Sequence, residues 1–276
     1  MNRNNRDFKI HCIALTKNEA DVVGFCLREA AKWADHVYVY DGGSTDGTWE
    51  IVQAMADAVI VPWKQDGKVF REGLRAEVFE AFRGGAKAGD WWLQLNVDEF
   101  YPEDPREFFR RVPRSHNMVW GLNVEYKITD LDLERIDFDD SFERVMPQLK
   151  HFRVDWSEPR AFRHRDGLQW NLNAAWPVHA GLVARERIVF RHYPFRSPQQ
   201  IQTRLDVRRE NRERGFGGWD HAKELSWREK IVPADECRVD DGTLVPDFDP
   251  RALPNHLEKP HVRILKRMLH GAGVWP

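Results

Sequence analysis

The first hundred residues alternate short apolar runs with segments of helical periodicity, and this alternation limits the folds open to the chain. Four apolar runs have the composition of buried strands: 8–15, 36–40, 58–61 and 91–97. The segments between them repeat apolar residues at helical spacing: 19–33, 48–56 and 71–88. Strands that alternate with helices in this way build parallel sheets. The sequence therefore predicts an α/β fold with its ligand site at the carboxyl ends of the strands.

The pattern changes after Tyr101. We expect a short helix at 106–111, a strand at 118–128, an irregular charged segment at 129–176, a strand at 183–192 and a helix at 197–214. A basic amphipathic segment, residues 261–270, lies close to the end of the chain. It is expected either to touch a membrane surface or to dock on the rest of the protein.

Charge and cysteine content exclude several classes of protein. Lys plus Arg number 42 and Asp plus Glu 44, so the net charge of −2 disfavours a globally basic nucleic-acid binder. The three cysteines include no C-x-x-C pair, which disfavours a disulfide framework or a zinc ribbon. The polar start, Met1–Lys9, does not look like a signal peptide, and no apolar run reaches the length of a membrane span. We therefore expect a cytoplasmic protein.

Several motifs of common enzyme classes are missing from the chain. It has no G-x-x-x-x-G-K-[ST] loop, no G-x-G-x-x-G at the start of a helix, no H-E-x-x-H and no G-x-S-x-G elbow. These absences disfavour the usual ATPase, dehydrogenase, zincin and hydrolase assignments.

Polar residues instead gather where the predicted strands end. The first strand runs into Thr16–Glu19, the second into Asp41–Thr48 (DGGSTDGT), and the fourth into Asn96–Glu99. A carboxylate at a strand end can bind a ribose hydroxyl, and glycines let a flat ligand approach the backbone. Acidic side chains there can also hold a divalent cation. Taken singly, each segment could equally be a capped turn or a solvated acidic turn.

The combination resembles glycosyltransferase family 2, most clearly around DGGSTDGT and WWLQLNVDEF. The resemblance implies a GT-A fold, an α/β architecture with a mixed, mainly parallel central sheet that binds a nucleotide-sugar. It also implies a nucleotide-sugar-binding set, with Arg75 at the pyrophosphate and Arg71 beside it: Thr16, Asn18, Glu19, Asp41, Gly43, Ser44, Asp46, Arg71 and Arg75. Asp98, followed by Glu99, is the expected catalytic and metal-binding position, for manganese or magnesium.

One position departs from the family pattern. Asn96 stands where the first Asp of the metal-binding Asp-x-Asp is usual, so one formal charge near the cation is missing. A unit charge at about 4 Å is worth roughly 4 kcal/mol at an effective dielectric constant near 20. Asn96 therefore remains a candidate ligand that binds more weakly or does not ligate at all.

The second half resembles, more loosely, a subset of the family that modifies bacterial surface polysaccharide and lipopolysaccharide. The matching features are Arg160–Arg163, Trp170, Pro177–His179 and Arg191–Tyr193. Ala180 stands where that subset has a glutamate, so the general base is open among Glu158, Asp155, Asp166 and His179. His192 is a further candidate ligand for the metal or the diphosphate. For each histidine a purely structural role is the alternative.

These resemblances predict a metal-dependent, inverting glycosyltransferase. Its partners would be a nucleotide-diphosphate sugar donor and a saccharide, a lipid-linked or another hydroxyl acceptor, with DNA and contact with the inner face of a membrane left open. We expect a GT-A domain at 1–200, divided into a nucleotide-sugar half (1–101) and an acceptor half (102–200), and a helical C-terminal extension at 201–276. The alternatives are a relative that has lost catalysis and, with less support, a nucleotidyltransferase.

Overall fold

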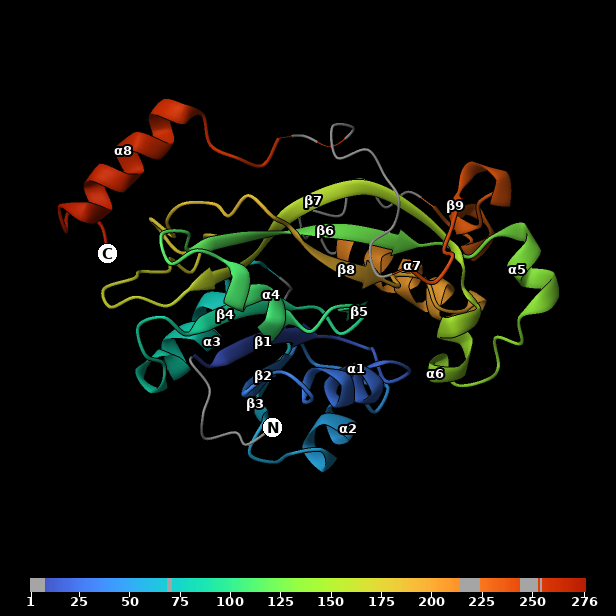
Figure 1. Ribbon diagram of the computed structural model, residues 1–276. Coiled ribbons are helices and arrows are strands. Elements are labelled where there is room, and N and C mark those ends of the chain that lie inside the picture. Colours follow the sequence, from blue (N-terminus) through green and yellow to red (C-terminus); the bar gives the residue numbers. More distant parts are fainter. Residues whose placement is uncertain (1–7, 69–70, 214–223, 244–252, 254) are drawn as a thin grey trace. The chain divides into compact units, whose positions relative to one another are not determined.

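The structure is a computed structural model, which describes residues 8–68, 71–213, 224–243, 253 and 255–276 (Figure 1). Its contacts divide it into two compact units, and each is described here by itself. The first unit comprises Met1–Leu122, Trp156–Phe190 and Asp249–Pro276, and the second comprises Asn123–Asp155 and Arg191–Phe248. The signal-peptide prediction concerns Met1–Lys9, of which residues 1–7 lie outside the described residues.

The sheet of the first unit begins with four parallel strands, as the alternating pattern predicts. They are β1 (Ile10–Thr16), β2 (His36–Asp41), β3 (Ile60–Gln65) and β4 (Trp91–Leu95). β1 pairs with β2 and β4, and β2 pairs with β3, all in parallel. Thr16 and Asp41 are partners in the register of β1 and β2, so both strands end at the same level of the sheet.

Antiparallel neighbours complete the sheet. β7 (His151–Arg163) pairs with β4 in antiparallel register, with Trp91 opposite Arg163. Over the described residues the strand order is β3-β2-β1-β4-β7-β6-β8-β5, where β5, β6 and β8 are Glu99–Phe100, Met118–Tyr126 and Ile188–His192. The predicted α/β class with a mixed, mainly parallel sheet is confirmed.

Four helices of the first unit follow the predicted segments, three with shorter bounds and the fourth beginning one residue earlier than predicted. They are α1 (Val23–Ala30), α2 (Thr48–Ala54), α3 (Leu74–Phe82) and α4 (Pro105–Arg111). α3 ends well before residue 88 because a 3-10 turn at Arg83–Gly85 contains two glycines, which are poor helix formers. α4 begins where Asp104 accepts a hydrogen bond from Arg106 N at 2.8 Å and proline occupies the first turn.

Aromatic side chains fill the core of the first unit. Trp91 and Trp92 of β4 are fully buried, and Phe79 of α3 meets Trp92 edge to face at 5.0 Å between ring centroids. Phe162 of β7 and Trp170 join the same cluster. These tryptophans therefore belong to the packed interior, where flat rings bury a large apolar area.

The prediction of an irregular segment at 129–176 is wrong. It contains α5 (Asp130–Arg135), α6 (Phe142–Val145), a 3-10 turn at Met146–Gln148 and all of β7, a strand of 13 residues. β7 carries charged residues at positions that are buried, such as Arg160, so its sequence lacks the alternation of apolar and polar residues that marks a strand. A charged residue that is buried with a partner interrupts this alternation, so the pattern does not predict the strand.

The second unit combines part of β7 with helices. β9 (Arg238–Val239) pairs with the start of β7 in antiparallel register, and Tyr126 stacks on Tyr193 at 4.5 Å. α7 (Pro198–Glu213) confirms the predicted helix, apart from residue 214, which lies outside the described residues. Two 3-10 turns, Trp227–Lys230 and Ala234–Glu236, follow it. The two units are each assembled from separate chain segments. The predicted domain boundaries at 101 and 200 remain a prediction.

The last helix of the first unit, α8 (Pro260–Gly271), confirms the predicted amphipathic segment. Among the helices that the described residues form, none is both long and apolar enough to cross a bilayer.

Gly73, at the start of α3, is packed against the backbone of Leu172. A Cβ atom at Gly73 would lie 1.5 Å from the Leu172 carbonyl oxygen, and the local backbone is otherwise ordinary, with φ at −65°. We expect Gly73→Ala to lower the free energy of unfolding in urea by about 1 to 3 kcal/mol, because the two segments must move apart. Gly84→Ala is the control, since nothing lies within 4 Å of its Cβ position. Equal stabilities of the two variants would contradict this packing.

Candidate active site

Two loops that follow β1 and β2 are joined by hydrogen bonds from their side chains. Asn18 N donates to Ser44 Oγ at 2.8 Å, and Asn18 Oδ1 accepts from Thr45 N at 2.9 Å. Glu19 N donates to Thr48 Oγ1 at 2.8 Å. Asp46 Oδ2 accepts from Ala20 N at 3.0 Å. The structure thus brings together the Thr16–Glu19 and Asp41–Thr48 segments, as the strand register requires.

Asp41 shapes the second of these loops. Its carboxylate is fully buried and accepts hydrogen bonds from Gly43 N, Ser44 N and Gln65 Nε2, at 2.9, 2.7 and 3.0 Å, and from Ser44 Oγ at 2.5 Å. Gly43 has a φ of +81°, and a Cβ there would lie 3.2 Å from the Gly67 Cα. Glycine is needed at this position on both counts.

The Thr16 hydroxyl stands at the same strand end. It is buried, and no hydrogen-bond partner for it is found in the described part of the chain. A buried hydroxyl without a partner is costly, and it is a reasonable site for a ligand atom to satisfy. The roles of Thr16, Asn18, Glu19, Asp41, Gly43, Ser44 and Asp46 toward a nucleotide nevertheless remain a prediction.

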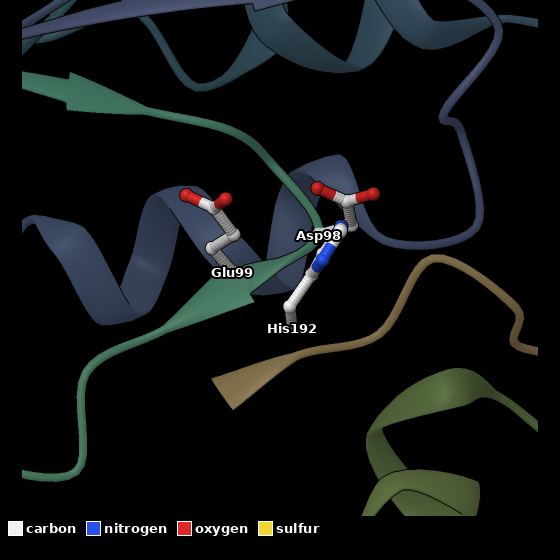
Figure 2. Close-up of side chains that lie close together, drawn as sticks. All are labelled: Asp98, Glu99 and His192. Atoms are coloured by element: carbon white, nitrogen blue, oxygen red, sulfur yellow. The ribbon is translucent and has the colours of Figure 1, made fainter. Parts of the chain in front are cut away.

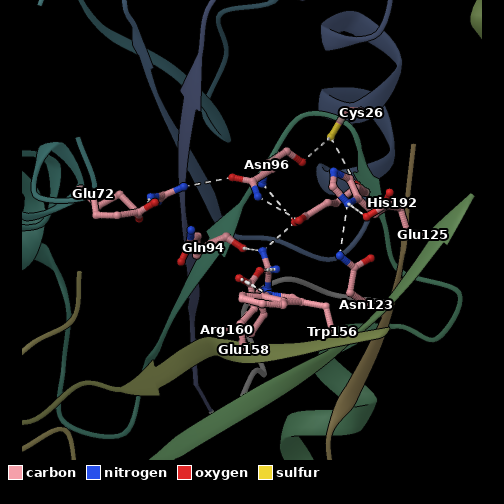
Figure 3. A network of polar contacts seen from close by, with 12 residues as sticks. Cys26, Glu72, Gln94, Asn96, Asn123, Glu125, Trp156, Glu158, Arg160 and His192 are labelled. Carbon is pink, nitrogen blue, oxygen red and sulfur yellow. Dashed lines mark hydrogen bonds and ion pairs between the residues drawn. The ribbon is translucent and has the colours of Figure 1, made fainter. Parts of the chain in front are cut away.

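A series of side chains that mostly alternate in charge contact one another in the first unit, and they join α3, the segment after β4, and β7. We call it the charge chain, and its members are Glu72, Arg75, Asn96, Glu99, Arg160 and Glu158. Figure 3 labels Glu72, Asn96, Arg160 and Glu158. Asn96 is the one neutral member. The two arginines and Glu99 are almost fully buried, whereas Glu72 and Glu158 at the ends are partly exposed.

Arg75 of α3 enters the chain at one end. It forms an ion pair with Glu72, and its Nη2 donates to Asn96 Oδ1 at 3.0 Å. With its side-chain amide turned to satisfy the donors, Gln94 offers a second oxygen to Arg75 Nη2 at 2.6 Å. Burial lowers the pKa of the Arg75 guanidinium, and Glu72 partly offsets that effect.

Arg160 of β7 forms the centre of the other end. Its Nη1 donates to Glu99 Oε2 at 2.7 Å, and its Nη2 pairs with Glu158. The guanidinium also lies 3.9 Å from the centroid of the Phe190 ring. Burial opposes the charge of Arg160, but Glu99, Tyr101 and Glu158 outweigh it, so the pKa of Arg160 is raised.

Asn96 links the Arg75 end and the Arg160 end of the charge chain, because its side-chain amide can both accept and donate a hydrogen bond. Its Oδ1 accepts from Arg75, and its Nδ2 donates to Glu99 Oε1 at 2.8 Å. An aspartate at this position would have no donor for Glu99 and would set two carboxylates side by side. The structure therefore gives a physical reason for the missing first Asp of the metal motif. Both polar atoms of Asn96 are engaged, which makes it a poor metal ligand.

Asp98 lies on the turn between β4 and β5, Glu99 is the first residue of β5, and Figure 2 shows both side chains leaving this segment. Asp98 is 5% exposed and Glu99 2%. Both carboxylates are close enough to Cys26 of α1 to reinforce the effect of burial, which raises the pKa of the Cys26 thiol. Carboxylate oxygens are the ligands that Mg²⁺ and Mn²⁺ prefer. Glu99 pairs with Arg160, and the metal-binding role of Asp98 remains a prediction.

The remaining candidates lie away from the charge chain or in the other unit. Arg71 is exposed and donates to Glu77 at 3.0 Å. His179 is exposed, has a φ of +56° and stacks on Trp275 at 3.9 Å. His192 belongs to the second unit, where its Nδ1 lies 3.3 Å from Asn123 Nδ2 and 4.0 Å from Glu125. The catalytic role of His179 and the metal role of His192 remain predictions.

Sequence reasoning overlooked three members of the site. Glu72 and Gln94 were not singled out, and Arg160 was noted only as part of a motif. Gln94 did give a signal, because it is a polar residue inside the apolar run WWLQL. Arg160 gave none, since its partner Glu99 is 61 positions away in the sequence.

Comparison with protein families agrees with these observations. Residues 12–137 match the family model described as Glycosyl transferase family 2. The match covers less than half of the chain, and over this segment the chain is similar to family 2 glycosyltransferases. The family resemblance read from DGGSTDGT and WWLQLNVDEF is thereby confirmed, whereas the bacterial surface-polysaccharide subset remains a prediction.

A curated relative and two solved structures were also found. An uncharacterized glycosyltransferase from Rickettsia felis is 28% identical over 121 residues, which are 44% of this chain and 39% of that protein, so the chain spans about two fifths of its length. Mannosyl-3-phosphoglycerate synthase from Rubrobacter xylanophilus is 13% identical, with a TM-score of 0.35 and 75% of each chain covered. A putative glucose-1-phosphate thymidylyltransferase from Bacillus anthracis is 10% identical, with a TM-score of 0.32, covering 42% of this chain and 55% of that one.

Replacing Asn96 by aspartate tests its place in the charge chain. In Asn96→Asp two carboxylates come into contact, so their shared pKa rises above that of the unfolded chain. A group of this kind contributes its stability at low pH and loses it as the pH rises through the raised pKa. We expect urea unfolding at pH 8 to show a loss of about 2 to 4 kcal/mol, and a smaller loss at pH 5.

Asn173→Asp provides the matched control, because Asn173 is exposed and the same exchange there should change little. An Asn96→Asp variant that is as stable as the parent at pH 8 and binds Mn²⁺ more tightly would contradict the role of Asn96 as the link between Arg75 and Glu99. It would return Asn96 to the set of metal ligands.

Proposed function

We propose that this protein is a metal-dependent, inverting glycosyltransferase that moves a sugar from a nucleotide-diphosphate sugar to an acceptor hydroxyl. One observation carries the proposal. The two joined loops after β1 and β2 and the Asp98–Glu99 turn after β4 all follow parallel strands of the same sheet, within the family 2 segment. Ligands of such sheets bind at these strand ends. A GT-A type donor site there is the simplest account.

Asp98 is the residue that would hold a Mg²⁺ or Mn²⁺ ion in the first unit. When bound, a divalent cation offsets the negative charge that develops on the diphosphate leaving group. Glu99 supports Asp98 from the next position, since its own carboxylate is fixed by Arg160 and Asn96. The contacts of Glu99 therefore fix the segment that carries Asp98.

The two arginines of the α3 region have different parts in this proposal. Arg71 is exposed and pairs with Glu77 at the surface, so it can turn toward a diphosphate at little cost. Arg75 is buried among Glu72, Gln94 and Asn96. It positions the Asn96–Glu99 turn and adds positive potential rather than wrapping around phosphate oxygens.

Glu158 is our choice for the base that takes the proton of the acceptor hydroxyl. An inverting transfer needs one such group at the acceptor. Glu99 is enclosed, whereas the Glu158 side chain is 32% exposed and is oriented by Arg160 and by Trp156 Nε1, which donates at 3.0 Å. Glu158→Gln should therefore lower kcat by at least about 100-fold, the usual worth of a general base, while donor affinity is kept. An unchanged kcat would exclude it.

The acceptor is proposed only by class, as a hydroxyl of a saccharide, of a lipid-linked saccharide or of another polymer. A relative that binds the donor without transferring it is the second candidate, motivated by Asn96 and Ala180. The hydrogen bonds of Asn96 to Arg75 and Glu99 give a structural reason for asparagine at this position. Asn96 is therefore weaker support for a loss of catalysis.

Thermal denaturation with a panel of nucleoside diphosphates tests the donor site. UDP, GDP, CDP, dTDP and ADP are each added with and without Mn²⁺. A ligand present at about a hundred times its dissociation constant stabilises the native state by about 2.7 kcal/mol. For this size of chain we expect one base to raise the melting temperature by several degrees, and to do so only with the metal.

The variant Asp98→Asn should abolish the metal-dependent part of that shift. Asp139→Asn, an equal exchange at an exposed residue of the second unit, should leave the shift intact. Stabilisation by none of the five nucleotides, or an equal shift in Asp98→Asn, would refute the proposed donor site.

A further inference from the structure

Helix α8 contacts the rest of the first unit through its basic side chains. Arg263 Nη2 lies 3.1 Å from His116 Nε2. Lys266 Nζ donates to the Gly181 carbonyl at 3.1 Å and to Glu258 at 2.7 Å. The side chains of Arg263 and Lys266 are only 15% and 25% exposed. The polar side of this helix therefore faces the protein.

The apolar side of α8 faces outward. Ile264, Leu265 and Met268 are 59%, 53% and 65% exposed, and their spacing of one and four residues places them on one face of the helix. Val274, just after the helix, is 65% exposed. A surface helix of a globular protein normally turns its apolar stripe toward the core. The reversed orientation, with neighbouring large side chains left open, is typical of an interaction surface.

The helix that carries this apolar face is basic. The sequence of α8, PHVRILKRMLHG, contains no Asp or Glu, and Arg267 and Lys259 are exposed. Burial lowers the pKa of His116, and Arg263, Arg267 and Arg185 lower it further, so these three cations lie in one neighbourhood. The acidic residue closest in sequence, Glu258, is already paired with Lys266.

We propose that the outward face of α8 binds the surface of an anionic lipid bilayer. Ile264, Leu265 and Met268 would enter the boundary of the acyl region, while Arg267 and Lys259 would contact headgroup phosphates. The combination of an apolar stripe and flanking cations is the chemistry of helices that lie in a membrane interface. At 12 residues α8 is too short to span a bilayer, which suits a helix lying flat. This proposal is independent of the transferase activity.

Co-sedimentation with vesicles tests the proposal. The full chain is mixed with vesicles of phosphatidylcholine alone, or of phosphatidylcholine with 30% phosphatidylglycerol, at 50 and 500 mM NaCl. We expect binding to the anionic vesicles at low salt, at least a fivefold smaller bound fraction on neutral vesicles, and weaker binding at high salt.

Two variants separate the apolar and the electrostatic contributions. Ile264→Ser/Leu265→Ser/Met268→Ser should reduce binding to anionic vesicles at least fivefold, and Lys259→Gln/Arg267→Gln should remove most of the dependence on salt. Leu131→Ser/Leu225→Ser removes two exposed leucines elsewhere and should bind as the parent does. Circular dichroism confirms that each variant is folded.

Absence of vesicle binding by the parent chain would overturn the proposal, and so would full binding by the triple serine variant. A parent chain that dimerises, with the triple variant monomeric and no binding to vesicles, would assign the face to a second copy of the chain instead.

Discussion

The buried ion pair between Glu99 and Arg160 is the interaction on which the candidate site depends. It joins the turn after β4 to β7, two segments that are distant in sequence, and both side chains are almost completely enclosed. Burying two charges is expensive, and removing one partner leaves the other without compensation. The charge chain meets this cost by giving Glu99 further donors from Asn96 and by giving Arg160 a second carboxylate in Glu158. The turn that carries Asp98 is thereby held in one position.

The loops after β1 and β2 are organised by a different principle. Side-chain oxygens of these loops accept hydrogen bonds from backbone N–H groups of the same or the adjacent loop. The loop conformations are therefore preformed in the absence of a ligand. Preformed loops reduce the conformational entropy that binding would otherwise cost. One end of the sheet thus combines two preorganised loops with an acidic turn, and this combination, rather than any single motif, supports a donor site.

Sequence analysis was most successful where structure is local. Apolar runs in the sequence predict the parallel strands β1 to β4, and the loops after them contain the glycines and short polar side chains that such turns require. β7 was missed because Arg160 is charged, and only a partner remote in sequence makes its burial tolerable. The role of Asn96 was equally hidden. As a departure from a family pattern it suggested a weaker metal site, whereas its contacts with Arg75 and Glu99 give it a structural purpose.

The most direct test of this account is the release of nucleoside diphosphate from a nucleotide-sugar. The purified chain would be incubated with Mn²⁺ and sugars of UDP, GDP, CDP, dTDP and ADP, together with a mixture of simple saccharide acceptors, and the free nucleoside diphosphate would be quantified over time. The account predicts release from the sugars of one base, at least about a hundredfold faster for the parent chain than for Asp98→Asn. Release that is equal in both proteins, or absent with every donor although a nucleotide binds, would contradict it and leave a binding protein built on a transferase fold.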